Sequence, residues 1–224
     1  MPDPLYYSLW FPTFSPIEML PRALAAMRQF PFSKSKPGVD YLSLHPLSWN
    51  ETSVLERRYP EGISPEDAIR DAEEFLYEDY AYVFRLHWDL WQPAVSLPGG
   101  ILPDDANAED ADNDAAANVP GEPSDEWQSR PRPVQLIVHG LQFDDGACEQ
   151  NGHIQFDLGL DAPFLQEGMG LTPLVESRVR ANIQHLVDFT VGLEKHSGAN
   201  ARLLWSESEE NLAQKLLTRL QKTQ

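Results

Sequence analysis

The sequence is short of cysteine, of basic side chains and of long apolar runs, and each shortage excludes a class of protein. Cys148 is the only cysteine in 224 residues, so no intrachain disulfide can form and no secreted disulfide framework is indicated. No stretch approaches the roughly 18 apolar residues that a membrane-spanning helix needs. The first basic residue is Arg22, and the start of the chain lacks the basic and apolar segments of a signal peptide. We therefore expect a soluble, cytoplasmic protein.

Basic residues are outnumbered by acidic ones along the whole chain. Lys and Arg total 17 against 35 Asp and Glu, which gives a formal net charge of −18. The excess is −6 in residues 1–100, −7 in 101–133 and −5 in 134–224. A field of this sign repels phosphate backbones and anionic lipid, so we expect neither nucleic acid nor a membrane as a partner. It would attract a basic protein, although solubility alone also accounts for the charge.

Residues 101–133 are the most unusual segment. They include nine carboxylates and five prolines, with no Lys or Arg before Arg130. Apart from Trp127 the segment has little to bury, so it cannot offset the entropy cost of ordering. We therefore divide the chain into a first α/β half (1–93), an acidic Pro/Ala/Asp-rich insertion (94–133) and a second α/β half (134–224), which can form one continuous domain with the first.

Repeated capping signals mark the helix starts. A Ser or Thr directly before Pro places a capping hydroxyl ahead of a residue that is preorganised for the first helical turn. These pairs predict helices after Ser15, Ser64 and Thr172, and an acidic first turn predicts a fourth after Ser206. Apolar spacing extends the second helix to about Asp79. In the first helix, Pro21 predicts a kink or a later start near Leu20.

Alternation of apolar and polar residues predicts seven strands. Asp144-Asp145-Gly146 and Asn151-Gly152 mark a hairpin loop between the fifth and sixth strands. The strands are expected at 5–11, 39–47, 52–59, 82–91, 134–143, 154–160 and 201–205.

The predicted order of elements is βαββαβ, the insertion, and then ββαβα. The first six elements match the ferredoxin-like split βαβ pattern, in which two helices cover one face of a four-stranded antiparallel sheet. In that pattern the first and last strands are neighbours. We therefore predict an α+β fold with a ferredoxin-like first half, and a second half that extends its antiparallel sheet or packs on it.

A polar and aromatic surface is expected on the helix-free face of this sheet, where alternate residues of the first and fourth strands point away from the core. His87 and Asp89 stand two residues apart, so both can project into a cleft in which the carboxylate raises the basicity of the imidazole. The same pattern fits a half-exposed strand whose polar groups are paired against the second half or a partner subunit. The candidates are Arg85, His87, Asp89 and Ser8 for catalysis, and Tyr6, Trp10 and Trp91 for binding.

The sequence has no recognised catalytic or cofactor motif. It lacks a P-loop, a dinucleotide-binding glycine pattern and a Gly-x-Ser-x-Gly elbow. Residues 110–114 resemble the start of a calcium loop, but Ala115 and Gly121 stand where Gly and Glu are required. Cys148 has acidic neighbours, which disfavour a thiolate. A zinc site would have to be assembled by the fold from His139, His153 and Asp157, and we predict no metal and no cofactor.

Two functional hypotheses remain open. The first is a non-enzymatic, acidic interaction or regulatory module that binds a macromolecule, above all a basic protein. Bacterial immunity proteins and small adaptors are analogies on charge and fold alone, and a homo-oligomer is compatible with this hypothesis. The second is an enzyme of unknown class, a hydrolase or isomerase, that uses Arg85, His87 and Asp89. The two differ in whether the helix-free face is a cleft or a packed interface.

Overall fold

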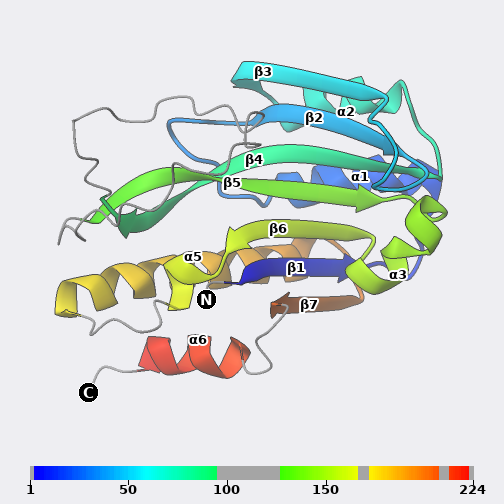
Figure 1. Ribbon diagram of the computed structural model, residues 1–224. Helices are drawn as coiled ribbons and strands as arrows, with labels where there is room; N and C mark the ends of the chain where they lie inside the picture. Colours follow the sequence, from blue (N-terminus) through cyan, green and yellow to red (C-terminus); the bar gives the residue numbers. More distant parts are fainter. Residues whose placement is uncertain (1–2, 95–126, 166–171, 207–211, 222–224) are drawn as a thin grey trace.

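Seven antiparallel strands form one sheet in the computed structural model, which describes residues 3–94, 127–165, 172–206 and 212–221. All seven predicted strands are confirmed. They are β1 (Pro4–Trp10), β2 (Val39–Pro46), β3 (Leu55–Ile63), β4 (Tyr80–Pro93), β5 (Trp127–His139), β6 (Ile154–Leu160) and β7 (Ala201–Ser206). Figure 1 shows their order across the sheet, which is β3-β2-β4-β5-β6-β1-β7.

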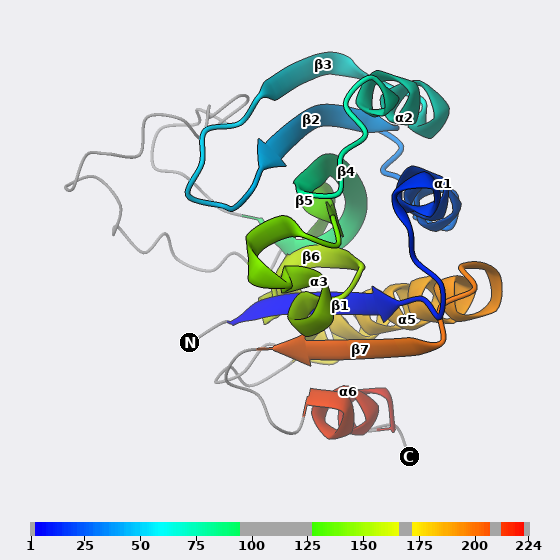
Figure 2. The ribbon, with the colours of Figure 1, turned by 90° about the vertical axis from the view of Figure 1, so that its right-hand side faces the viewer.

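The longer helices cover one face of this sheet. Figure 2 shows α1, α2 and α5 together on one side of it, with the other side free of these three. No helix in the described residues is long and apolar enough to cross a membrane. The helices are α1 (Pro16–Met27), α2 (Pro65–Glu73), α3 (Ala147–Asn151), α4 (Ala162–Leu165), α5 (Pro173–His196) and α6 (Leu212–Gln221), with a 3-10 turn at Phe143–Asp145.

The predicted helix starts after Ser15, Ser64 and Thr172 are confirmed, but the Ser15 side chain makes no capping hydrogen bond, whereas those of Ser64 and Thr172 do. Ser64 Oγ accepts a hydrogen bond from Asp67 N at 3.1 Å, and Thr172 Oγ1 accepts one from Val175 N at 3.4 Å. The first helix begins directly after Ser15 and includes Pro21, so the later start near Leu20 is wrong. The predicted cap of the last helix falls on 207–211, which lie outside the described residues.

Several predicted boundaries differ from the structure. The strand predicted at 52–59 spans 55–63, and two other boundaries are wrong for physical reasons that involve other parts of the chain. The second helix ends at Glu73 rather than near Asp79, because the Tyr82 hydroxyl accepts from Tyr77 N and donates to Phe75 O in place of helical partners. The strand predicted at 134–143 spans 127–139 instead, so the end of the predicted insertion is strand. β6 pairs with β5 only at 135–138, and the free edge before it tolerates Pro131 and Pro133.

The strand order corrects the ferredoxin-like prediction, while the α+β class is confirmed. β4 pairs with β2 and β5, whereas β1 pairs with β6 and β7. The two strands that were expected to be neighbours are therefore separated by β5 and β6. The reason is the β4–β5 hairpin, which runs from Ala81↔His139 to Pro93↔Trp127 and occupies the edge of β4 that β1 would need. The second half does extend the sheet.

One hydrophobic core fills the space between the sheet and the helices. Both predicted halves contribute to it: Leu5 and Phe84 come from the first, and Leu136, Phe156 and Phe189 from the second. Trp88 is fully buried there and contacts Phe164 and Phe189. The helix-facing residues of neighbouring strands thus form a continuous apolar surface, which leaves the opposite face and the ends of the sheet for function.

β4 pairs with β2 only as far as Arg85, so residues 86–93 extend beyond β2. Other segments bind the backbone edge that is left free there. Ser33 N donates to His87 O at 2.6 Å. Further along, the Asn182 side chain on α5 accepts from Trp91 N and donates to Trp91 O, each at 2.8 Å. These contacts satisfy backbone groups that would otherwise be an open sheet edge.

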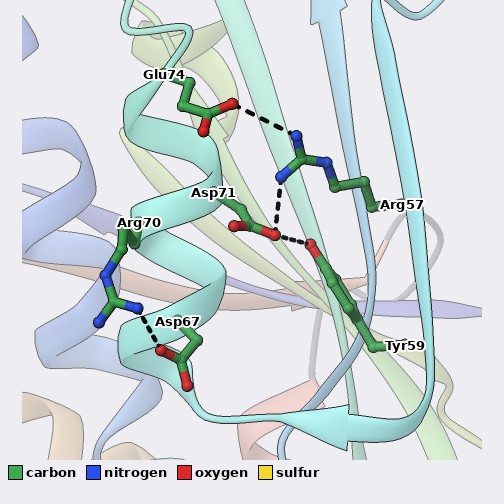
Figure 3. Close-up of polar contacts among 6 residues, drawn as sticks. All are labelled: Arg57, Tyr59, Asp67, Arg70, Asp71 and Glu74. Atoms are coloured by element: carbon green, nitrogen blue, oxygen red, sulfur yellow. Dashed lines mark hydrogen bonds and ion pairs between the residues drawn. The ribbon is translucent and has the colours of Figure 1, made fainter.

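A polar network attaches α2 to the edge strand β3 (Figure 3). The Tyr59 hydroxyl donates to Asp71 Oδ2 at 2.6 Å, and Arg57 lies 2.9 Å from the same carboxylate and 3.4 Å from Glu74. This hydrogen bond and the arginine keep the pKa of Asp71 below its usual value. Charged side chains along β3 also discourage pairing with another sheet.

Candidate functional site

The predicted site residues lie on two separated parts of the helix-free face. Arg85 on β4 is directly opposite Gln135 on β5. Asp157 on β6 is directly opposite both Gln135 and Tyr6, which lies on β1. Direct opposition places all four side chains on one face, but β5 and β6 stand between the two groups of candidates. At about 4.8 Å per strand, the groups are about 14 Å apart. The single surface expected from adjacent strands is not formed.

The β1 candidates pack against the second half of the chain. The Tyr6 and Trp205 rings lie 4.6 Å apart, and Trp205 Nε1 donates to Ser8 Oγ at 3.1 Å. Trp10 Nε1 donates to Glu149 O at 3.1 Å. Ser8 is fully buried, so its hydroxyl serves the Trp205 indole rather than facing an open cleft.

The β4 candidates surround an acid that sequence reasoning missed, Asp40 at a register shift of β2. Arg85 Nε donates to Asp40 Oδ1 at 2.8 Å, and its guanidinium lies 5.2 Å from the Tyr41 ring centroid. Asp40 Oδ2 is 3.7 Å from His87 Nδ1. Burial lowers the pKa of His87 and outweighs the opposing effect of Asp40. The acid beside His87 therefore does not raise the basicity of the imidazole above its usual range.

Asp89 and Trp91 hold neighbouring segments instead of completing a dyad with His87. Asp89 accepts from Ser33 Oγ at 2.6 Å and from Lys34 N at 3.1 Å, which fixes the loop between α1 and β2. The Arg178 guanidinium stacks 3.5 Å from the Trp91 ring centroid. This geometry gives the two residues roles in anchoring a loop and α5, and the enzyme hypothesis stays a prediction.

The side chains considered for zinc are each engaged elsewhere. His139 Nδ1 donates to Gly152 O at 2.8 Å, His153 Nδ1 accepts from Phe11 N at 3.0 Å, and Asp157 Oδ1 accepts from Gly159 N at 2.9 Å. Within the described ranges no three His, Cys, Asp or Glu side chains are grouped to hold a metal.

Burial and Glu149 raise the pKa of the Cys148 thiol, which agrees with an unreactive cysteine. The calcium-like residues 110–114 lie outside the described residues.

Three connections meet at one end of the sheet, which we call the loop end and define as residues 47–54, 73–79 and 140–149. It lies at the right of Figure 1, beside α3. Leu47 N donates to Asp79 O at 2.7 Å, and Asp144 N donates to Leu47 O at 2.7 Å. Gln142 N donates to Glu78 O at 2.9 Å. Because backbone bonds join all three connections, the loop end is a fixed surface.

The backbone of the loop end is strained. In the described residues, left-handed φ values outside glycine occur at Leu47 (61°), Asp144 (47°) and Asp145 (48°), and all three belong to this surface. Aspartate tolerates this conformation moderately well, but a leucine with its bulky side chain rarely adopts it. Strained residues persist where the surrounding structure enforces them, and they gather at functional sites.

The loop end combines exposed apolar side chains with charge of one sign. Leu47 is 57% exposed, Trp49 41% and Tyr77 52%. Trp49 is fixed edge-on to Phe143, with ring centroids 5.0 Å apart. The residues that define the surface include no Lys or Arg and eight carboxylates, of which Glu74 is paired with Arg57 on β3: Glu51, Glu73, Glu74, Glu78, Asp79, Asp144, Asp145 and Glu149. Such a surface suits a ligand that is both cationic and apolar.

Sequence reasoning missed the loop end because its residues are distant in the chain. Asp144-Asp145-Gly146 was a turn signal, and nothing local linked it to Leu47 or Tyr77. The available signal was the absence of basic residues from three connections of an otherwise mixed chain.

Comparisons of the chain with known protein families, with curated proteins and with solved structures found no match.

Proposed function

We propose that the protein is a non-enzymatic interaction module, immunity-like or adaptor-like, whose loop end binds a basic protein. The observation that carries this proposal is Leu47, an exposed leucine held in a left-handed conformation among eight carboxylates. Burial in the core does not explain an apolar side chain that is more than half exposed. Contact with a partner does, because exposed apolar side chains beside charges of one sign are typical of docking surfaces.

Charge complementarity identifies the class of partner. The seven carboxylates other than Glu74 would attract Lys and Arg side chains during encounter and speed association. Trp49 and Tyr77 offer aromatic faces on which a guanidinium or ammonium group can stack. The net charge of −18 adds a long-range field of the same sign, so the partner is a basic polypeptide.

The experiment is capture from a source lysate on immobilised protein at about 50 mM NaCl, followed by titration of the identified partner. We expect a basic polypeptide whose affinity falls as NaCl rises to about 500 mM, since screening shortens the Debye length. The variant E78Q/D144N/D145N should weaken binding at low salt. A captured partner of neutral or acidic charge, or an affinity independent of salt, would contradict the proposal.

Leu47→Asn separates strain from function. Asparagine tolerates the left-handed conformation better than leucine, so L47N should raise the free energy of unfolding by about 0.5–1 kcal/mol. It should nevertheless weaken partner binding, because the apolar contact is lost. The matched control is Ile17→Gln, which removes an apolar side chain that is 80% exposed on α1. Equal binding by L47N and wild type would exclude Leu47 from the interface.

A further inference from the structure

A cavity of about 230 Å³, broadly open to solvent, is lined by residues of α5, β1 and β7. Tyr7 and Leu204 are directly opposite each other on β1 and β7, and Arg202 stands two residues from Leu204 on the same strand. Thr190 and Glu194 lie one helical turn apart on α5. These five residues line the cavity.

The walls of the cavity present groups of both charges. Arg202 Nη2 and Glu194 Oε1 form an ion pair between β7 and α5. The Arg202 side chain is 42% exposed and that of Glu194 is 47% exposed. An ion pair with this exposure contributes little to stability, so a ligand can replace it at small cost, and a ligand held by the same two side chains would bind weakly, in the millimolar range of concentration.

Tyr7 adds a polar group without a partner. The residue is only 3% exposed, and no hydrogen bond to its hydroxyl is found within the described residues. Burial raises the pKa of Tyr7 to about 12, so the hydroxyl stays protonated and can donate. The hydroxyl is not one of the fully buried polar atoms that lack a partner in the described residues, so it is open to the cavity and a polar ligand atom can reach it.

We propose that this cavity binds a small zwitterion, an α-amino acid. Its carboxylate would pair with Arg202 and its ammonium group with Glu194, while Tyr7 and Leu204 contact the remainder. A simple anion would meet the Glu194 carboxylate, and a simple cation would meet the Arg202 guanidinium. A neutral zwitterion is also not repelled by the net charge of −18. The volume is below the roughly 300 Å³ of drug-sized sites, which fits a ligand of this size.

The test is a thermal melt of the full chain with L-alanine, L-valine or L-leucine at about 20 mM, beside their N-acetyl and carboxamide forms. At least one free amino acid should raise Tm by about 2 °C or more, since a ligand that binds only the native state stabilises it. Its two blocked forms, each lacking one charge, should not. No shift with any free amino acid, or equal shifts with the blocked forms, would overturn the proposal.

Variants of the lining residues test whether the Tm shift arises from binding in this cavity. R202Q and E194Q should each abolish the Tm shift, and Y7F, which removes only the hydroxyl, should weaken apparent affinity several-fold. The matched control is R28Q, which breaks the similarly exposed Arg28–Glu66 pair on α1 and α2 and should leave the shift intact. Amide chemical-shift changes confined to residues around Thr190 and Leu204 should accompany binding. Changes elsewhere, with a full Tm shift in R202Q, would place the ligand outside this cavity.

Discussion

At the scale of single residues, burial has a larger effect on the pKa values of several histidines than neighbouring charges have. His87 lies beside Asp40, yet its pKa is lowered because loss of hydration outweighs the carboxylate. His45, His153 and His185 are shifted in the same direction, with burial as the main cause. An imidazole in these positions is therefore held neutral, and acid should weaken the fold through several histidines at once.

His139 gives the clearest test of this effect. Burial lowers its pKa to about 4, whereas the unfolded chain protonates near 6.5. The stability from neutral His139 is therefore complete above about pH 6.5 and is lost as the pH falls towards 4. Between pH 7.5 and pH 5, His139→Gln should lose about 2 kcal/mol less unfolding free energy than wild type. Urea denaturation at both pH values measures this.

His196→Gln is the control for that comparison, because His196 is exposed near the end of α5. It measures the effect of replacing an exposed histidine with glutamine under the same two pH conditions. If His139→Gln matched wild type, another group would have to account for the acid sensitivity. At position 139, glutamine is chosen because its side-chain amide can replace the hydrogen bond from His139 to Gly152 O and does not titrate.

At the scale of the element, short polar networks decide how helices attach to strands. α2 is held to β3 by Tyr59, Arg57 and Asp71 (Figure 3), and its exposed Arg70–Asp67 pair lies within the helix itself. A hydrogen bond to a half-buried carboxylate should contribute more than an exposed ion pair. The network thus joins two elements, whereas the Arg70–Asp67 pair joins neighbouring turns.

We therefore expect Tyr59→Phe to lower the free energy of unfolding by about 1 kcal/mol, and Arg70→Gln to lower it by less than about 0.5 kcal/mol. Urea denaturation measures both. In an Asp71→Asn background, Tyr59→Phe should cost less than in wild type, because the two residues share one interaction. Equal costs in both backgrounds would show that the tyrosine stabilises α2 by packing alone.

At the scale of the whole molecule, the acidic insertion joins the two strands of one hairpin. Pro93 and Trp127 are paired across β4 and β5, so the chain leaves and re-enters the sheet at adjacent positions. Trp127 also packs against the core. The insertion that composition placed at 94–133 is therefore shorter at its C-terminal end, and 127–133 belong to the fold.

Replacing residues 97–124 with a short Gly/Ser linker should shift Tm by only a few degrees, because paired ends need little chain to connect them. Extending the replacement to Ser129 should lower Tm further, because it removes three residues paired with β4, Trp127 among them. Thermal melts of the two variants test the boundary. A large loss from the shorter replacement would show that the acidic segment contributes to the core.

Local patterns in the sequence determined the elements of this fold. Period-two alternation located β1, β4 and β6, because side chains alternate between a core face and an open face whatever the neighbouring strand is. Ser64 and Thr172 marked helix starts, because capping satisfies backbone groups within a few residues. The α+β class followed from the order of these elements, and the faces on which Arg85 and Tyr6 lie followed from the alternation.

Only the tertiary structure decided which elements are neighbours. The β4–β5 hairpin separates β1 from β4, Asp40 rather than Asp89 faces His87, and hydrogen bonds bring Leu47, Asp79 and Asp144 together. Each of these facts depends on contacts between residues far apart in the chain, whose free energies are summed over the whole sheet. Local periodicity fixes the direction of a side chain, but the partner it meets depends on the order in which the strands pair.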